Sequence, residues 1–283
     1  MIAGYALVAL AALLWGCIGP LSKYAFMAGM PPLEVAFWRI TMAWALYGVH
    51  AVRLGRVRVA PADLPWLAAF GVVGIAGLFG SYVLAVQAGG AALASVLLYT
   101  APAWVALMAW KLLRESMTPV KLTAVAMTIL GVAGVSLGHG LGGPGGPVNL
   151  AAIGFGLLSG FSYALYYVFG KIFLPRYPTP TLFLYALPVG ALTLLPFFSF
   201  AAHPLEGWLA CLVLAVGCTY GAYMLYYAGL KRIEASRAAV IATLEPLVAA
   251  LLAFSLFGER FTTLGYVGSG LILTAVLLTI CKR

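Results

Sequence analysis

Long apolar runs dominate the chain, and short segments marked by charged residues and by clusters of glycine and proline separate them. Crossing a bilayer as a helix takes about 20 apolar residues, and these runs reach that length. They show no strand-like alternation of apolar and polar positions, so the pattern predicts spanning helices and excludes a membrane barrel. The ten helices that we predict are 3–26, 33–52, 65–86, 90–112, 119–138, 150–172, 180–200, 207–229, 236–257 and 262–281.

Composition supports the same fold class. Of the 283 residues, 64% are hydrophobic and only 8% are charged, whereas about 25% of a soluble domain is charged. A soluble or disordered chain is therefore excluded, and we expect an all-α polytopic membrane protein. Residues 1–5 contain no Lys or Arg, so the first run is predicted to stay as a helix rather than to act as a cleaved signal.

The basic residues predict the orientation. Ten helices place both termini on one side of the membrane, and of the 16 Lys and Arg residues only Lys23, Arg39 and Arg260 fall on the other side. Because basic loops stay in the cytoplasm, we expect both termini there and the protein in the inner cell membrane. The net charge of +9 is then a matter of topology, and it does not indicate a nucleic-acid partner.

Matching residues recur in the second half of the chain at an offset of 144 positions. The matches are Leu13, Leu14 and Gly16 with Leu157, Leu158 and Gly160, then Pro102 with Pro246, and Glu115 with Glu259. We therefore predict two repeats, 1–138 and 150–283, joined by an external Gly/Pro-rich linker at 139–149. Each repeat has five helices, an odd number, so the copies enter the membrane from opposite sides, as in secondary transporters that work by alternating access.

Three motifs resemble the EamA-type drug/metabolite transporters. They are LEPLVAALLAFSLFGERFTTLGYVGSGLIL from Leu244, then Phe37-Trp38-Arg39 and Leu14-Trp15-Gly16. Within that family the chain is most similar to bacterial aromatic amino-acid exporters, which are also associated with paraquat export. The resemblance implies two inverted five-helix repeats around a central cavity, and export of small metabolites from the cytoplasm. Ala101 stands where the first repeat would match Glu245, which argues against a symmetric pair of carboxylates.

Two of the charged residues that lie within predicted helices are our candidates for polar contacts with a substrate. Glu245 lies near the bilayer centre, where a carboxylate costs about 2.5–3.5 kcal/mol. It could bind an amino group or exchange a proton, or it could fix helix packing. Arg39 could hold a carboxylate through two hydrogen bonds, extend to the membrane surface, or pair with Glu34 or Glu245.

Five aromatic residues within the runs are candidates for the wall of a binding cavity: Trp15, Trp38, Tyr82, Tyr99 and Tyr163. Such rings suit flat or apolar solutes. The aromatic cluster at 220–227 is instead predicted to pack all round its helix. Pro20, Pro102 and Pro246 lie inside predicted helices, where each removes a backbone donor, and we expect either hinges of a gate or static bends.

No catalytic residue, metal ligand or cofactor is predicted. The chain contains no HExxH, Walker or dinucleotide-binding motif, and its four cysteines lack metal-site spacing. The GxSxG at 134–138 is weak, because a nucleophile elbow needs a strand-to-helix turn. An intramembrane enzyme that uses Ser136 is therefore the less favoured alternative, and the scarcity of residues outside the predicted helices argues against a scaffold.

The hypothesis is a secondary transporter that exports amino acids, aromatic or large and apolar, and related small metabolites. The alternative is a proton-coupled efflux transporter of drugs and organic cations that works through Glu245. The expected partners are the substrate and the lipid bilayer, and a monomer of ten helices suffices. The sequence leaves open the exact substrate, its coupling and the resting conformation.

Overall fold

A computed structural model describes residues 2–137, 150–257 and 262–281, and within these ranges the chain is helical, with no strand. The helices of the first half are α1 (Ile2–Gly16), α2 (Ile18–Met27), α3 (Pro32–Arg53), η1 (Pro61–Asp63), α4 (Leu64–Ala69), η2 (Phe70–Ala76), α5 (Gly77–Leu98), α6 (Ala101–Leu112) and α7 (Pro119–Leu137). Those of the second half are α8 (Leu150–Phe173), α9 (Thr179–Leu194), η3 (Leu195–Phe197), α10 (Leu205–Val213), η4 (Leu214–Gly221), α11 (Ala222–Leu230), α12 (Ala235–Ala242), α13 (Leu244–Phe257) and α14 (Thr263–Cys281).

Eight helical segments among the described residues are long and apolar enough to cross a membrane. In α7 the part with described side chains, Pro119–Val135, is slightly shorter than a full span. The 22 residues of α3 include Glu34 and Arg39, which lower its hydropathy, and α3 is not one of the eight. The all-helical membrane architecture is thus present, and the predicted number of ten crossings stays a prediction.

Several of these segments are interrupted in mid-course. The first breaks at Cys17, between α1 and α2; another at Tyr99 and Thr100, between α5 and α6; a third at Thr243, between α12 and α13. The three predicted hinge prolines each lie in the first turn after one of these breaks: Pro20 in α2, Pro102 in α6 and Pro246 in α13. A first turn needs no internal amide donor, so proline costs little there.

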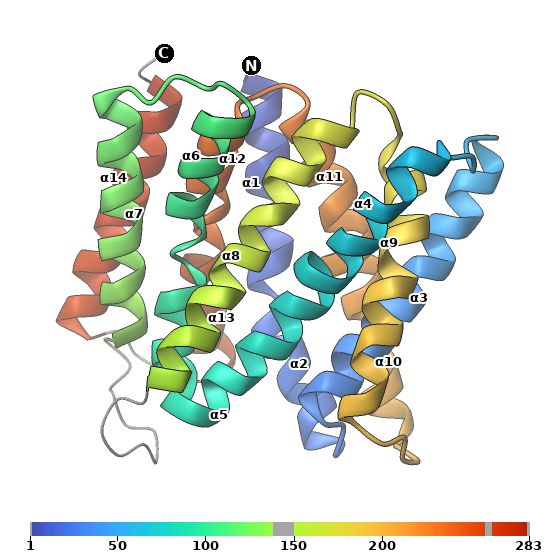
Figure 1. The fold of residues 1–283 in the computed structure, drawn as a ribbon. Helices are drawn as coiled ribbons and strands as arrows, with labels where there is room; N and C mark the ends of the chain where they lie inside the picture. The colour runs from blue at the N-terminus through green and yellow to red at the C-terminus, as the bar shows by residue number, and fades with distance from the viewer. Residues whose placement is uncertain (1, 138–149, 258–261, 282–283) are drawn as a thin grey trace.

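One long helix also changes direction. Gly90 has a φ of +82°, and this conformation splits α5 into two parts. Residues other than glycine rarely adopt a positive φ. The break separates the predicted helices 65–86 and 90–112, at the end of the molecule opposite the termini (Figure 1).

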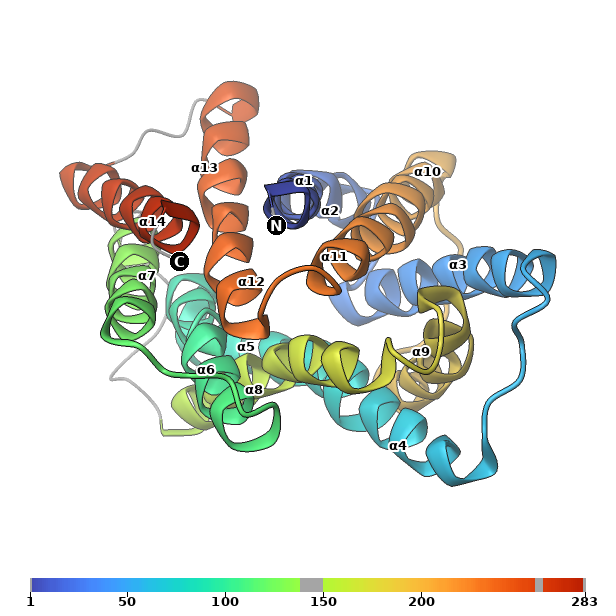
Figure 2. The same cartoon turned by 90° about the horizontal axis from the view of Figure 1, so that it is seen from above.

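Helices of the two halves interlock. The closest packing joins α5 to α8, α7 to α14, α3 to α9 and α1 to α11, and the end-on view shows the two halves sharing one bundle (Figure 2). Between α7 and α14 the backbones nearly touch, since a Cβ on Gly134 would lie 3.0 Å from the Cα of Gly268. Small residues permit such close approach in membranes.

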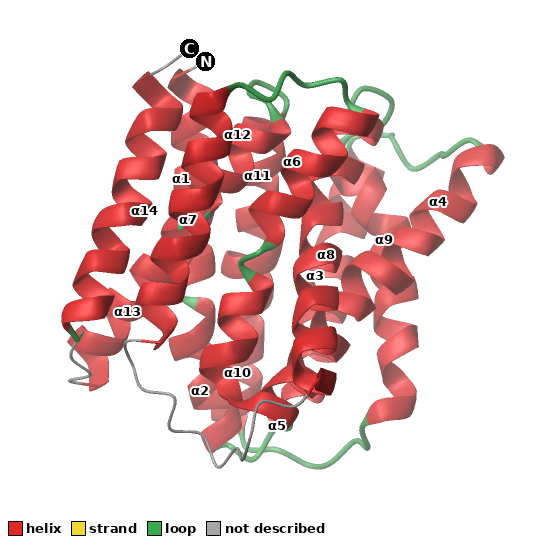
Figure 3. Cartoon of the chain, turned by 60° about the vertical axis from the view of Figure 1, so that its left-hand side comes forward, coloured by secondary structure: helices red, strands yellow, loops and turns green. Residues whose placement is uncertain are grey.

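Both termini lie at the same end of the bundle (Figure 3), which we call the terminal end. The elements of the halves follow the offset seen in the sequence: Pro119 and Thr263 begin α7 and α14, and Phe70 and Leu214 begin the π-helical segments η2 and η4. Both pairs are 144 positions apart. The predicted linker at 139–149 and Glu259 lie outside the described residues.

Candidate functional site: a central aromatic cavity

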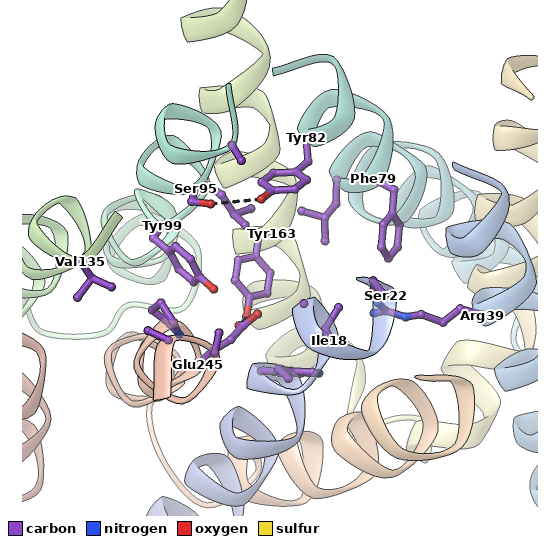
Figure 4. A pocket seen from close by; sticks show the side chains of 18 of the residues that line it. Ile18, Ser22, Arg39, Phe79, Tyr82, Ser95, Tyr99, Val135, Tyr163 and Glu245 are labelled. Carbon is purple, nitrogen blue, oxygen red and sulfur yellow. Dashed lines mark hydrogen bonds between the residues drawn. The ribbon is translucent and has the colours of Figure 1, made fainter. Parts of the chain in front are cut away.

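A cavity of about 560 Å³ lies inside the bundle, lined by residues of both halves (Figure 4). The sequence-predicted residues that line it are Trp15, Arg39, Tyr82, Tyr99, Tyr163, Glu245 and Pro246. They come from α1, α3, α5, α8 and α13 and from the break after α5, so segments far apart in sequence build one wall. The size is typical of a small-molecule pocket.

Glu245 is placed by the break at Thr243. It lies in the first turn of α13, where the unpaired backbone N–H groups of a helix favour a carboxylate. The hydroxyl of Tyr163 donates a hydrogen bond to its Oε2 at 3.0 Å. Figure 4 shows Tyr99 on the other side of the same carboxylate. Glu245 is the one carboxylate among the described residues that line the cavity.

Arg39 brings the positive charge. Its side chain is buried, its Nε donates to Oγ1 of Thr219 at 2.7 Å, and its guanidinium lies 5.2 Å from the centre of the Phe79 ring. Burial and these contacts show that Arg39 does not extend to the membrane surface. It does not pair with Glu34 either, because that carboxylate accepts a hydrogen bond from Trp38 and pairs with His203 at 2.9 Å.

Hydroxyl and indole groups add polar points to the aromatic wall. The hydroxyls of Tyr82 and Ser95 are hydrogen-bonded at 3.2 Å, within the cavity lining (Figure 4). The indole nitrogen of Trp15 is buried and has no hydrogen-bond partner among the described residues. A buried donor without a partner is uncommon and costs free energy.

Trp38 is not part of this site. It packs against Trp208, with ring centres 5.0 Å apart, and lies in a separate hydrophobic cluster with Met30 and Val35. Pro20 and Pro102 also lie outside the cavity lining, and of the three prolines only Pro246 contributes to it. Pro20 and Pro102 lie in first turns after helix breaks, and their role as hinges stays a prediction.

Towards the terminal end, buried rings close the cavity. Tyr166, Tyr167, Tyr226 and Tyr227 are each at most 2% exposed, and Tyr226 lies 5.2 Å from the ring of Trp15. We call these four rings the aromatic floor. Towards the opposite end the lining includes Phe26 and Ala91, which are exposed. The cavity therefore opens at the end opposite the termini.

Beyond the aromatic floor, two sets of polar contacts hold the terminal end closed. The carboxylate of Glu115 accepts hydrogen bonds from the backbone N–H groups of Ala235 and Ser236, at 2.7 and 3.2 Å, and from the Ser236 hydroxyl at 2.6 Å. It therefore caps α12, which has no side-chain cap of its own.

The second set is an ion-pair network around Glu234. Its carboxylate pairs with Lys121 at 2.8 Å and with Arg237 at 2.7 Å, and Arg237 also donates to the Tyr5 hydroxyl and to the Thr279 carbonyl. Burial alone would raise the pKa of Glu234, but the bonds from Lys121 and Arg237 outweigh it and hold this pKa below its ordinary value. The network joins α1, α7, α12 and α14.

Sequence reasoning missed several residues that line the cavity, namely Ser22, Phe79, Ser95 and Tyr223. It also missed Thr219, which accepts the hydrogen bond of Arg39 without lining the cavity itself. Tyr223 belongs to the cluster at 220–227 that was predicted to pack all round its helix. That prediction holds for the buried Tyr226 and Tyr227, whereas Tyr223 faces the cavity. The helix is apolar on every side, so its sequence carries no signal for the inward face.

The described residues hold no group of three or more His, Cys, Asp and Glu side chains that could bind a metal ion. The side chain of Ser136, the candidate nucleophile of the less favoured enzyme hypothesis, lies outside the described part of the chain.

Comparison with known proteins bears on the whole chain. Residues 2–137 and 150–281 match the EamA-like transporter family. The chain is 30% identical to an uncharacterized transporter of Archaeoglobus fulgidus, over 97% of this chain and 95% of that protein. It is 28% identical to an uncharacterized inner membrane transporter of Salmonella typhimurium, over 96% and 93% of the two chains.

The fold is shared with a protein of known crystal structure. The TM-score is 0.85 at 19% sequence identity, and the match covers 98% of this chain and 96% of that one. Together with the apolar helices and the family match over both halves, this makes the chain a multi-pass membrane protein with a small-molecule substrate. The chain belongs to the EamA-like transporter family.

Proposed function

We propose that this transporter exports amino acids, with a preference for aromatic or large apolar side chains. The observation that carries the proposal is that Arg39 and Glu245 line the same aromatic cavity. Arg39 would hold the substrate carboxylate, and Glu245 would hold its amino group. The rings of Trp15, Tyr82 and Tyr99 would pack on the side chain. The resemblance to aromatic amino-acid exporters supports the same substrate class.

The asymmetry of the halves supports a zwitterionic substrate. At the offset of 144 positions, Arg39 corresponds to Phe183 and Glu245 corresponds to Ala101. Each of the two charged residues therefore has an uncharged counterpart in the other half. A single cation and a single carboxylate in fixed places favour one orientation of a ligand that carries both charges.

We further propose that the halves, residues 1–138 and 150–283, are inverted repeats of five spanning helices, with both termini in the cytoplasm. The common offset of α7 with α14 and of η2 with η4 supports this arrangement. The described conformation is then open to the outside. Substrate would enter after the contacts of Glu115 and Glu234 at the terminal end break and the opposite end closes. Reporter fusions after Arg53, Leu112 and Leu230 should all be cytoplasmic, and an external reporter at any of them would contradict this topology.

Transport by the purified protein in liposomes tests the substrate. We expect saturable flux of labelled phenylalanine, a larger KM for threonine, and little flux of a paraquat-like dication. Arg39→Gln should raise the KM for phenylalanine about 10- to 100-fold, since it removes a charge-assisted contact worth about 1.5–3 kcal/mol. Lys111→Gln is the matched control, because Lys111 is exposed at the terminal end.

Two additional measurements separate binding from folding. Arg39→Lys keeps the charge but loses the planar guanidinium, so its KM for phenylalanine should fall between those of Arg39→Gln and the wild type. Thermal unfolding of every variant in detergent identifies those that do not fold. Unchanged phenylalanine transport in a folded Arg39→Gln protein would contradict the proposed role of Arg39.

The second candidate function is proton-coupled efflux of organic cations. Its supporting observation is that the half-buried Glu245 lies beside aromatic rings, a site that also suits a large cation. This function predicts dication flux that requires a pH gradient and loses that requirement in Glu245→Gln. Phenylalanine flux that ignores the gradient would contradict it.

A further inference from the structure

A second pocket, of about 370 Å³, lies at the terminal end and is separate from the central cavity. Its lining includes Arg56 and Arg58 from the loop between α3 and α4, and Arg176, Tyr177 and Thr181 from the turn into α9. The loop after α3 runs along the outer edge of the bundle beside α9 (Figure 2). We call this feature the arginine pocket.

The backbone of the arginine pocket is held in place by hydroxyl groups. Tyr177 accepts a hydrogen bond from the N–H of Ala60 at 3.0 Å and donates to Asp63 at 2.7 Å. Tyr185 donates to the carbonyl of Val57 at 2.8 Å, and Thr181 donates to the carbonyl of Arg56. The loop that carries Arg56 and Arg58 is therefore tied to α9 at several points and presents its arginines from a fixed backbone.

The arginine pocket has excess positive charge. Asp63 pairs with Arg176 at 2.9 Å and offsets one of the three guanidinium groups. Neither Arg56 nor Arg58 forms an ion pair with any carboxylate in the described ranges. Two guanidinium groups on one concave surface are suited to the oxygens of a phosphate group, which arginine can bind through paired hydrogen bonds.

The surroundings of the arginine pocket favour a position at the level of lipid headgroups. Trp66, at the start of the neighbouring helix, is 65% exposed, and Leu64 is 38% exposed. Exposed tryptophan beside apolar surface is typical of the membrane interface. The terminal end is also the face proposed to lie in the cytoplasm, where anionic lipids concentrate and basic pockets between helices bind their headgroups.

We propose that the arginine pocket binds an anionic phosphate group, supplied by the headgroup of a membrane lipid or by free phosphate. Arg56 and Arg58 would contact the phosphate oxygens, while Arg176 stays oriented by Asp63. This site does not depend on the identity of the transported substrate.

Thermal unfolding in lipid nanodiscs tests the proposal and separates the two sources. One arm compares phosphatidylcholine nanodiscs with others that contain increasing phosphatidylglycerol. The other arm adds inorganic phosphate to phosphatidylcholine nanodiscs at constant ionic strength, balanced with chloride. A ligand that binds the folded state raises Tm in a saturable way. The test variant is Arg56→Gln/Arg58→Gln, and the control is Lys111→Gln/Lys231→Gln, which removes two exposed charges at the same end.

We expect the wild type and the control to gain Tm with half-saturation at similar ligand levels, and the test variant to need at least tenfold more ligand. A response to phosphatidylglycerol alone identifies a lipid headgroup as the source, and a response to inorganic phosphate identifies the free anion. Equal responses of test and control variants in both arms, or no response of the wild type in either, would overturn the proposal.

Discussion

At the residue scale, the two charges of the cavity each form a hydrogen bond with a hydroxyl group, and they form no ion pair with each other in the described part of the chain. Glu245 accepts from Tyr163, and Arg39 donates to Thr219. An arginine has five N–H donors, and Arg39 uses only one of them in hydrogen bonds to the described residues. The hydrogen-bonding capacity that remains on Arg39 and Glu245 makes them suitable for binding a ligand. A direct ion pair between the two side chains would compete with that ligand.

The Tyr163 hydroxyl gives a first prediction. Tyr163→Phe removes the donor to Glu245 and keeps the ring, so the KM for substrate should change about 5- to 30-fold, the equivalent of about 1–2 kcal/mol. The control is Tyr226→Phe, because the Tyr226 hydroxyl is buried without a partner in the described part of the chain. Tyr226→Phe should leave KM unchanged and raise stability by up to about 1 kcal/mol. Liposome transport and thermal unfolding check both. If Tyr163→Phe and Tyr226→Phe changed KM equally, the role given to the Tyr163 hydroxyl would be refuted.

At the scale of elements, broken helices carry the functional groups. The break at Thr243 places Glu245 in a first turn, and the π-helical η4 contains Thr219, which contacts Arg39. Segments of π-helix are often found at functional sites. The continuous helices α7 and α14, in contrast, pack closely against each other.

The contact between α7 and α14 gives a second prediction. A Cβ on Gly268 would lie 2.7 Å from the backbone nitrogen of Val135, whereas a Cβ on Gly270 would meet nothing within 4 Å. Gly268→Ala should therefore destabilise the protein by about 1–3 kcal/mol, the usual range for overpacking. Gly270→Ala should be neutral or slightly stabilising, because alanine favours helix. Thermal unfolding of both variants in the same detergent measures the difference, and equal Tm values would show that the helices can separate without cost.

The capping of α12 by Glu115 gives a third prediction. Glu115→Ala should cost about 1 kcal/mol in the local stability of α12, as loss of a cap usually does. Amide hydrogen exchange over residues 235–242 should then be about fivefold faster. Glu206→Ala, in the exposed first turn of α10 at the opposite end, is the control and should leave this exchange unchanged. Unaltered amide hydrogen exchange in Glu115→Ala would show that Glu115 does not help to hold the terminal end closed.

At the scale of the whole molecule, one end is closed by layers and the other is open. The aromatic floor lies under the cavity, and beyond it Glu115 and the network of Glu234 join elements of both halves. Movement of the halves has to break these polar contacts in particular. Both sets involve the start of α12, so this segment is the place where opening of the terminal end would begin.

The Glu234 network gives a fourth prediction, on pH. The folded-state pKa of Glu234 is lowered, so its stabilising contribution is present above the unfolded value of about 4.3 and is lost as pH falls through the folded value. Below about pH 4.5 the Tm of the wild type should therefore fall more steeply than that of Glu234→Gln. Near pH 7 the wild type should be the more stable of the two. Thermal unfolding between pH 3 and 7 checks this, and parallel curves would contradict it.

The family resemblance, the membrane fold and seven of the 20 described residues that line the cavity could be predicted from the sequence. Long apolar runs predict helices because lipid offers the backbone no other partner. Arg39 and Glu245 stand out because charge is costly there. The match of both halves to a transporter family agrees with the predicted class and disfavours an intramembrane enzyme. The number of crossings and the inverted repeats stay predictions.

What the sequence by itself determined is therefore which segments are helical and which residues are out of place in an apolar helix. The tertiary structure decided which side of each helix faces the cavity. Trp38 and Arg39 are neighbours on α3, yet one packs in a separate cluster and the other lines the site. Tyr223 and Tyr227 lie on the same face of α11, yet only Tyr223 lines the cavity, so packing also decides how far along a helix face the cavity extends. The physical reason is that lipid and protein interior are equally apolar, so a membrane helix carries no polar face to mark its outside, and only its packing against the other half selects the inner one.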